Sequence, residues 1–412
     1  MKVLFLYILL SAVVFGDDLK SLLEFAKKNN NLVNSAKISI SSKENELKSA
    51  KSDYFPTLDL NAYYKRDDEA STFQPATTYS ASAKLGFDIY DGGKKSYTKK
   101  QKEDEKNSAL YSYEDTKKSI LLSITKDYYN LKSLQSLLEA RVEAAKAVEA
   151  QLHRIQKFYE ADLATSDDVD RMQSANDSNI YAIESIKFQI VVLKKSLELK
   201  VGKKIDSFEK STFDKTLQTK KDILDGIKAV KYNKTALTNF AQTIDSYYYP
   251  SIHIEDRYSF YGYEDKPIIA GQTMPLLDKQ NEIMATLNLR LFDFGTIREK
   301  KEAIKLKADA LNEKIIYKLK EQQMQLEIAK ERIVTTKLNI KSSKSALKSA
   351  TSALKTITKK YNAGVVDNVV YLDALSSQTK AKSTYEKSLN DLEIAYAIYY
   401  YYNNENLEKF IK

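Results

Sequence analysis

The sequence predicts a mainly α-helical fold with a β part, built as two copies of one elongated unit. Gly and Pro are scarce, with 10 Gly and 5 Pro in 412 residues, against averages of about 7% and 5%, so turns are few and elements are long. Short motifs recur at a nearly constant distance along the chain. In each copy the hydrophobic period changes from two residues to seven, which indicates strands followed by a long coiled-coil helix.

The composition argues against most enzymes. Cysteine is absent, which excludes disulfides, thiolate metal sites, thiol catalysis and a lipid on an N-terminal Cys. His153 and His253 are the two histidines, too few for a multi-histidine metal site. We therefore expect no catalytic residue, cofactor or metal. The net charge of +9 comes from interspersed acidic and basic residues, which indicates a solvated helical surface and no nucleic-acid partner.

Residues 1–16 predict an export signal peptide. Lys2 is followed by a run that is apolar from Val3 to Phe15 except for Ser11, and Gly16 precedes two aspartates. The run is shorter than the roughly 20 residues of a membrane-spanning helix. We expect cleavage after Gly16. The mature chain has no long apolar stretch, so any part of it that spans a membrane must do so as strands.

Three motifs of the first half recur in the second half. Tyr54-Phe55-Pro56 recurs 194 residues later as Tyr248-Tyr249-Pro250, and Tyr90-Asp91-Gly92-Gly93 recurs 202 residues later as Phe292-Asp293-Phe294-Gly295. Lys157 to Ala161 recurs as Lys359 to Ala363, again 202 residues later. The spacing predicts a first structural repeat over 17–202, an equatorial linker over 203–221, a second repeat over 222–401 and a C-terminal tail over 402–412.

Each repeat begins with a helix, at about 18–53 and 222–247, and continues with a β-hairpin. Four segments alternate between apolar and polar residues; they predict strands at about 57–66, 79–90, 251–261 and 283–292. Their length of about ten residues matches a tilted strand that crosses a bilayer. Polar loops over 67–78 and 262–282 connect the strands, and the second loop contains the eight extra residues of the second repeat.

The hairpins lead into helices with a seven-residue hydrophobic spacing, at about 94–159 and 296–361. The apolar or aromatic positions of the two series are Ile124, Leu131, Leu138, Ala145, Leu152 and Tyr159, and then Leu326, Ile333, Ile340, Leu347, Leu354 and Tyr361. Such a repeat predicts coiled-coil packing. A short turn follows each long helix, and return helices are expected at 167–200 and 368–401.

Four strands from one chain cannot close a barrel, and an open sheet edge in lipid leaves backbone groups unpaired. Two chains would give eight strands, which side chains fill completely, whereas three give twelve. The sequence therefore predicts a homotrimer with a 12-stranded β-barrel in contact with membrane lipid.

At this point the chain resembles the TolC-like outer-membrane efflux proteins, also called outer membrane factors. The resemblance rests on the duplication and on the order of the motifs, to which Tyr361-Asn362-Ala363-Gly364 and Tyr371-Leu372-Asp373-Ala374 belong. It implies a trimeric 12-stranded outer-membrane β-barrel on a periplasmic α-helical coiled-coil barrel, in a Gram-negative bacterium. It also implies a passive duct, not an enzyme, that docks onto a periplasmic adaptor (a membrane fusion protein) and an inner-membrane RND or ABC pump.

The resemblance assigns a periplasmic gate near the two turns. Asp168 and Tyr361 occupy the positions of an Asp–Tyr pair, and Val370, Tyr371 and Asp373 lie in a segment where a family member carries Asp-x-x-Asp. Three-fold symmetry would place three Asp373 carboxylates in one ring and favour cations. The alternative is that Asp168 and Asp373 only begin solvated return helices, where acidic side chains are favourable.

The two turns match the family's tip motif, which meets the adaptor. Their residues are Ala161, Asp162 and Leu163 in the first turn and Ala363, Gly364 and Val365 in the second. The alternative is simple helix reversal, in which Gly364 supplies a positive φ. Val366 stands where the family often has Arg, so the means by which the gate is held stays open.

The function that the sequence favours is small-molecule or drug efflux as the outer-membrane channel of a tripartite export system. A duct for type I protein secretion is the alternative within transport. A periplasmic structural coiled-coil protein is the alternative outside it, although four two-faced strands argue against that class.

Overall fold

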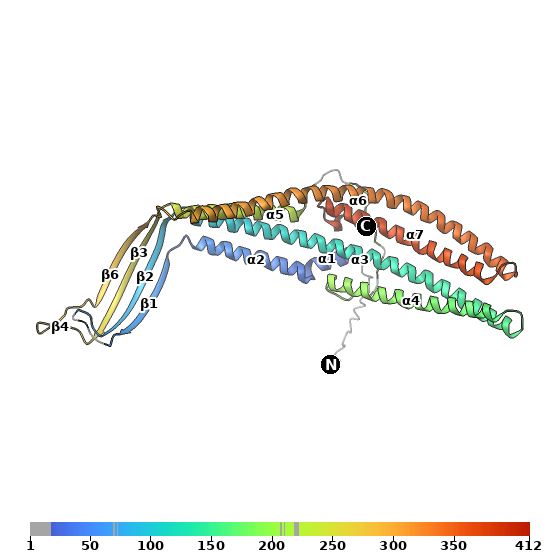
Figure 1. The fold of residues 1–412 in the computed structure, drawn as a ribbon, viewed down its shortest axis with the longest axis horizontal. Helices are drawn as coiled ribbons and strands as arrows, with labels where there is room; N and C mark the ends of the chain where they lie inside the picture. The colour runs from blue at the N-terminus through green and yellow to red at the C-terminus, as the bar shows by residue number, and fades with distance from the viewer. Residues whose placement is uncertain (1–17, 69–70, 72, 207, 210, 218–221) are drawn as a thin grey trace, which may run out of the picture. The chain divides into compact units, whose positions relative to one another are not determined.

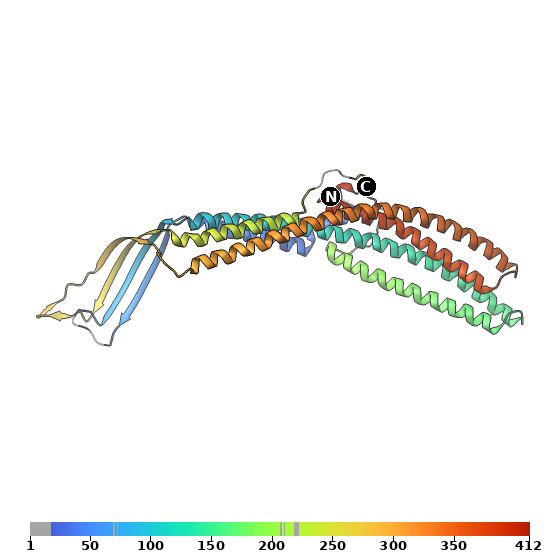
Figure 2. The ribbon, with the colours of Figure 1, turned by 45° about the horizontal axis from the view of Figure 1, so that its top comes forward.

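A computed structural model describes residues 18–68, 71, 73–206, 208–209, 211–217 and 222–412 (Figures 1 and 2). The predicted signal peptide at 1–16 and part of the predicted linker at 203–221 lie outside these residues. The chain divides into two compact units. The helical unit contains the chain up to Ala36, Tyr113–Asp225 and Leu319–Lys412, and the sheet unit contains Lys37–Ser112 and Gly226–Lys318.

The chain before the first hairpin forms two helices, α1 (Leu19–Asn29) and α2 (Asn31–Ser52), where the sequence predicted one. Asn30 separates them with an extended backbone at φ −68° and ψ 127°. Its side-chain Oδ1 accepts hydrogen bonds from the backbone N–H groups of Leu32, at 2.9 Å, and Val33, at 3.1 Å. The expectation of an unbroken helix was wrong. The Asn30 side chain accepts from backbone N–H groups in the first turn of α2, which would bind carbonyl groups of the preceding turn if the helix were continuous.

The two long helices are α3 (Lys94–Glu160) and α6 (Thr296–Asn362), each of 67 residues and therefore about 100 Å long. They begin in the same way. The Oδ2 atom of Asp91 accepts from the N–H of Lys95, and that of Asp293 accepts from the N–H of Ile297, each at 2.7 Å. These carboxylates satisfy N–H groups that have no partner within the helix.

The remaining helices are α4 (Ser166–Val201), α5 (Asp225–Asp245) and α7 (Asn368–Tyr402). The short 3₁₀ segments η1 (Ser246–Tyr248) and η2 (Leu407–Phe410) follow α5 and α7. Helix α5 begins three residues later than the sequence suggested and continues into η1 before the second hairpin. Among the described residues, none of the helices combines the length and apolar character needed to cross a membrane.

The sheet unit contains an antiparallel sheet in the order β1-β2-β3-β6. Its strands are β1 (Thr57–Arg66), β2 (Thr77–Asp91), β3 (Ser251–Glu264) and β6 (Lys279–Asn288). The fourth strand lies four residues before the predicted 283–292. Asn288 pairs with Ser251, the first residue of β3, and Pro250 before it has no N–H to donate, so pairing ends there and Leu289 and Leu291 lie beyond the strand. The loop before β6 also contains a small hairpin, β4 (Ile268–Ile269) and β5 (Gln272–Thr273).

The register keeps like residues on the same face of the sheet. Leu60 pairs with Ala83, which pairs with Tyr258, and Asp59 pairs with Lys84, which pairs with Arg257. One face is therefore mostly apolar and the other polar, as the alternation predicted. Asp256 is an exception, since it lies on the apolar face between Leu85 and Ile283.

The core of the helical unit is rich in tyrosine. Its largest fully buried side chains include Tyr128, Tyr129, Tyr396, Tyr399 and Tyr400. The hydroxyl groups of three of them reach into the segment that precedes α5: Tyr128 donates to the carbonyl of Glu209, Tyr129 to that of Ser211 at 3.0 Å, and Tyr400 to that of Thr216 at 2.9 Å. The C-terminal Tyr run thus packs against the linker region and the tail.

Candidate functional site

The two turns between long and return helices have the same backbone design. In the first turn, the N–H of Leu163 donates to the carbonyl of Phe158 at 2.7 Å. In the second, the N–H of Val365 donates to that of Lys360 at 2.9 Å. Asp162 and Gly364 take the positive φ that such a reversal requires, at 56° and 70°.

Each turn presents an exposed apolar side chain. Leu163 is 74% exposed and Val365 69% exposed, and a Cβ added at Gly364 would meet no atom within 4 Å. The two turns therefore carry an apolar side chain at matching positions, 202 residues apart. Both side chains are largely exposed to solvent in the single chain.

The predicted gate residues fall into two groups. Tyr361 and Tyr371 are buried and stack on each other, with ring centroids 4.9 Å apart and planes 15° apart. Burial raises the pKa of both hydroxyls. Val370 and Asp373 are exposed and lie three residues apart, on the same side of α7.

Asp168 has partners other than the predicted Tyr361. It forms a capping box with Thr165, whose Oγ1 donates to its Oδ2 at 2.8 Å. The Nδ2 of Asn368 donates to its Oδ1 at 3.2 Å. Asp168 therefore stabilises the start of α4 and links it to the start of α7. The role of Asp168 in a gate stays a prediction.

Two residues near this group were missed from the sequence. Arg154 on α3 donates from Nη1 to the Oδ1 of Asn362 at 2.8 Å, and its guanidinium lies 5.7 Å from the ring centre of Tyr361. Asn368 is buried although it is the first residue of α7 and follows the exposed second turn. Arg154 lies four residues before Phe158, so both side chains are on the same side of α3 close to the first turn. This spacing was the sequence signal that could have identified Arg154.

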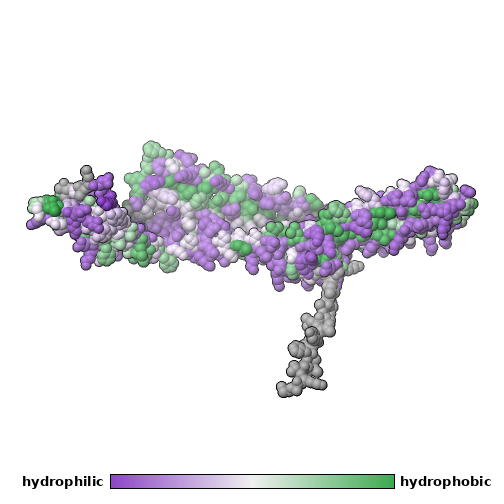
Figure 3. Space-filling model, turned by 90° about the horizontal axis from the view of Figure 1, so that it is seen from below, coloured by the Kyte–Doolittle hydropathy of each residue, from purple (hydrophilic) through white to green (hydrophobic). Residues whose placement is uncertain are grey.

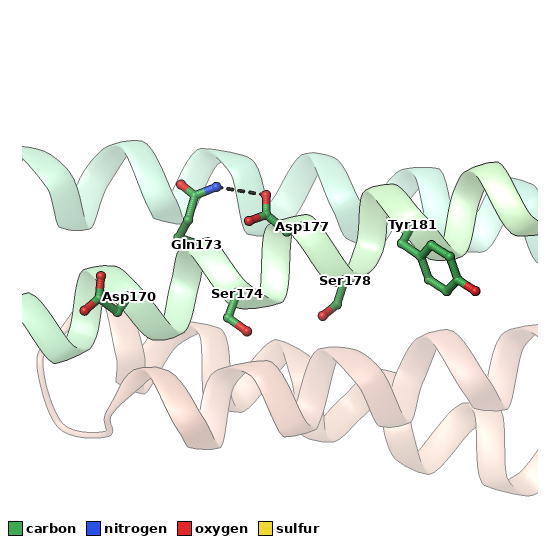
Figure 4. Close-up of a pocket in the computed structure, with 6 residues that line it drawn as sticks. All are labelled: Asp170, Gln173, Ser174, Asp177, Ser178 and Tyr181. Carbon is green, nitrogen blue, oxygen red and sulfur yellow. Dashed lines mark hydrogen bonds between the residues drawn. The ribbon is translucent and has the colours of Figure 1, made fainter.

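Helix α4 presents a continuous exposed face. Near the turn this face is polar and borders an open hollow (Figure 4), whose lining residues are Asp170, Gln173, Ser174, Asp177, Ser178 and Tyr181. Gln173 donates from Nε2 to the Oδ1 of Asp177 at 2.9 Å. Further along, the same face is apolar, with exposed Tyr181, Phe188, Val192 and Leu199. Figure 3 shows apolar surface interrupting the polar surface of the molecule.

The polar face of the sheet carries a network of charges. The Nζ of Lys84 lies 4.0 Å from the Oδ2 of Asp59 and 3.8 Å from the Oε2 of Glu255. Arg257 Nη2 lies 2.6 Å from Glu255 Oε1. Large apolar side chains on the opposite face, such as Leu58 and Leu60, are exposed. An apolar face of this kind is suited to lipid, and a charged face to water.

Within the described parts of the chain, no group of three or more His, Cys, Asp or Glu residues could hold a metal ion.

The family described as "Outer membrane efflux protein" matches residues 22–181, which include the first hairpin, the first long helix and its turn. No curated protein sequence matches the chain.

Solved structures of outer membrane proteins share the fold over almost all of the chain. The CmeC outer membrane channel of Campylobacter jejuni has a TM-score of 0.83 at 15% identity, covering 95% of this chain and 86% of that one. VceC of Vibrio cholerae has a TM-score of 0.78 at 16% identity, covering 94% and 96%. The open MtrE outer membrane channel of Neisseria gonorrhoeae has a TM-score of 0.75 at 14% identity, covering 94% and 89%.

The shared fold covers both repeats, and the TolC-like architecture expected from the sequence is confirmed. The family's members are passive channels of the outer membrane and not enzymes. The chain thus matches the outer membrane efflux protein family over residues 22–181 and has the fold of solved outer membrane channels over almost its whole length.

Proposed function

We propose that three copies of this chain form a passive duct that carries small molecules from a periplasmic adaptor and an inner-membrane pump to the exterior. The observation that carries the proposal is the sheet itself. It has one polar and one apolar face, and its outer strands, β1 and β6, each pair on one side only.

Those two edges favour assembly in a ring. Unpaired backbone groups at a sheet edge are costly in lipid, and four strands are too few to enclose a lumen. Joining β6 of one copy to β1 of the next would satisfy both edges, and three copies would give the twelve strands that the sequence suggested. The polar faces would then line the lumen and the apolar faces would meet lipid.

The helical unit offers a matching pair of edges. Figures 1 and 2 both show its long helices side by side in the order α4, α3, α7, α6, so α4 and α6 flank the layer. Both outer helices have exposed apolar side chains. They are Tyr181, Phe188, Val192 and Leu199 on α4, and Met324, Ile328 and Leu338 on α6. A head-to-tail interface between two unlike faces is the kind that closes into a ring.

The assembly has a direct test. Native mass spectrometry in detergent should give three copies per particle. Phe188→Glu introduces a charge into the proposed α4 interface, and we expect it to shift the protein toward monomers. Tyr159→Glu, at an exposed position on α3 of the same repeat, serves as the control. Monomers or dimers in the wild-type protein would refute the trimer.

The exposed face of α7 near the second turn is the best candidate for a gate. Val370 and Asp373 share this face, and three symmetric copies would bring three Asp373 carboxylates around one axis. Such a ring favours cations. We expect Asp373→Ala to reduce cation selectivity and to alter single-channel conductance. Unchanged values for both would leave Asp373 as a solvated helix residue.

The exposed turns are proposed to dock the adaptor. Leu163 and Val365 occupy equivalent positions, and both apolar side chains are largely exposed to solvent. The chain has no Cys, so a single Cys at either position gives a unique cross-linking site. Capture of the adaptor from both positions is expected, and failure at both would argue for simple helix reversal.

The choice of substrate and pump is the finer part of the proposal. The family description favours efflux, and with it an RND-type pump, over type I protein secretion with an ABC pump. A deletion strain should become sensitive to several toxic compounds while its secreted proteins stay unchanged. Loss of one secreted protein without a change in sensitivity would favour the secretion duct instead.

A further inference from the structure

Four charged residues lie in one row across the polar face of the sheet. Asp59 on β1 is directly opposite Lys84 on β2, Lys84 is opposite Arg257 on β3, and Arg257 is opposite Glu282 on β6. Each strand contributes one residue. The neighbouring rows on this face consist mainly of uncharged residues, such as Ser82 with Ser259.

The two central cations of this row share a buried carboxylate. Glu255, which is 8% exposed, lies 2.6 Å from the guanidinium of Arg257 and 3.8 Å from the ammonium of Lys84. Glu255 therefore holds Lys84 and Arg257 close to the sheet. Removing both cations would leave the buried carboxylate of Glu255 uncompensated, which is costly.

The two outer carboxylates are held less tightly. Asp59, whose side chain is 54% exposed, approaches Lys84 only to 4.0 Å. Glu282 is exposed, and in the described part of the chain it has no ion-pair partner. The negative charges at the two edges of the sheet are thus available to the solvent on the polar side.

We propose that this row, together with Glu255, forms a charged belt around the lumen that attracts cations and the cationic groups of exported molecules. The inference rests on the proposed three-copy duct. In a head-to-tail ring β6 of one copy is the neighbour of β1 of the next, so the strands that carry Glu282 and Asp59 meet at each seam. Each seam then presents two solvent-exposed carboxylates.

The net charge of the belt is negative. Three carboxylates, on Asp59, Glu255 and Glu282, stand against the two cations of Lys84 and Arg257, which leaves one negative charge per chain and three per ring. A 12-stranded barrel with the usual strand spacing and tilt has a backbone radius of about 12 Å. The charged ends project inward from that radius, so the axis lies within about one Debye length, ~8 Å, at physiological salt.

The test is the ion selectivity of the purified channel in planar bilayers, measured as the reversal potential in a KCl gradient. We expect the wild-type channel to prefer K⁺. Asp59→Asn and Glu282→Gln each remove one negative charge per chain at nearly constant size, and each should lower the permeability ratio of K⁺ to Cl⁻. The double variant leaves a positive belt and should lower the ratio further than either single variant. Its effect should weaken at about 1 M salt, where the Debye length is ~3 Å.

Asp256→Asn is the matched control. Asp256 adjoins Arg257 on the same strand and carries the same charge, but it lies on the apolar face between Leu85 and Ile283. Its removal should leave the reversal potential unchanged. Asp373→Asn, tested in parallel, separates the contribution of the proposed gate from that of the belt.

Each outcome is decisive. A double variant that conducts with the wild-type reversal potential overturns the belt and leaves the duct intact, and so does an anion preference in the wild-type channel. If the double variant does not assemble, the two single variants answer the same question. A wild-type protein that forms no pores, or no trimers, overturns the duct and the belt with it.

Discussion

Lys118 on α3 is the residue whose replacement should most clearly weaken the helical unit. Its ammonium group lies 2.7 Å from the Oδ2 of Asp225, the first residue of α5. It also donates to the backbone carbonyl and the side-chain Oδ1 of Asn404, just after α7, each at 2.9 Å. The side chains of Lys118 and Asp225 are 11% and 8% exposed. One buried cation therefore joins three segments that are far apart in the sequence.

Lys118→Met keeps most of the aliphatic stem and removes the charge. Breaking a buried ion pair by deleting one member costs about 3–5 kcal/mol, because the other member is left buried without compensation. Asp225 retains a hydrogen bond from the Nδ2 of Asn404 at 3.2 Å, which places the cost near the lower limit, at about 3 kcal/mol. For a unit of this size each kcal/mol lowers Tm by about 2–4 °C, so we expect a decrease of roughly 6–12 °C.

The measurement is thermal unfolding followed by far-ultraviolet circular dichroism in detergent at a fixed scan rate. Lys117→Met is the control, since the adjacent Lys117 pairs with Glu114 within one helix turn, at 2.5 Å. An ion pair of this intrahelical type contributes about 0.3–0.5 kcal/mol. If the Lys118 variant melts within about 2 °C of the control, the reasoning about the buried ammonium is refuted.

Three further predictions concern the sheet, the tyrosine core and the turns. A Cβ at Gly262 would lie 2.0 Å from the ring of Tyr79, so Gly262→Ala should lower the yield of folded trimer on semi-native gels. Adding Tyr79→Ala should restore that yield, and a normal yield from Gly262→Ala alone would contradict the predicted clash. Burial raises the pKa of Tyr128 from 10.0 to about 12. As pH rises, the hydroxyl proton is therefore lost first in the unfolded state, and stability should decrease between about pH 10 and about pH 12. Tyr128→Phe should make the decrease of Tm with pH shallower, and an unchanged slope would contradict this assignment. Asn368→Ala removes the hydrogen bond to Asp168 that joins the two return helices, and we expect a higher single-channel conductance, whereas an unchanged value would limit Asn368 to packing.

The sequence predicted those features of the fold that depend on periodicity. The alternation of Leu58 and Leu60 with Asp59 assigned both faces of β1, and the seven-residue series from Ile124 and Leu326 located the two long helices. These patterns survive in the structure because successive side chains of a strand point to opposite faces and residues seven apart share one side of a helix, along the whole element. The end of the fourth strand was misplaced because the residues beyond it continue to alternate, and only the position of the pairing strand limits its length.

Contacts near the turns were less predictable. The resemblance assigned Tyr361 and Asp168 to a gate pair, and that role stays a prediction. Within one chain Tyr361 stacks on Tyr371, and Asn368 donates a hydrogen bond to Asp168. Both arrangements fit the same local sequence, since each needs only a residue of suitable length on a facing helix. Which pair forms depends on the rotation of α6 and α7 about their axes, and a seven-residue pattern does not determine that rotation closely.

The duplication explains how one chain can supply both sides of a ring interface. In the sheet, β1 is the first strand of its hairpin and β6 is the second strand of the other hairpin, so the two edge strands are not equivalent positions of the repeat. In the helical unit the two edges are α4, a return helix, and α6, a long helix. Because each repeat contributes one edge of a different kind, head-to-tail joining is favoured over the pairing of like edges. Asp59 and Glu282 lie on the two edge strands, so the proposed belt concentrates its carboxylates at the seam of the sheet, whereas Phe188 lies on α4. The charge of the belt and the assembly of the ring should therefore be altered by different residues.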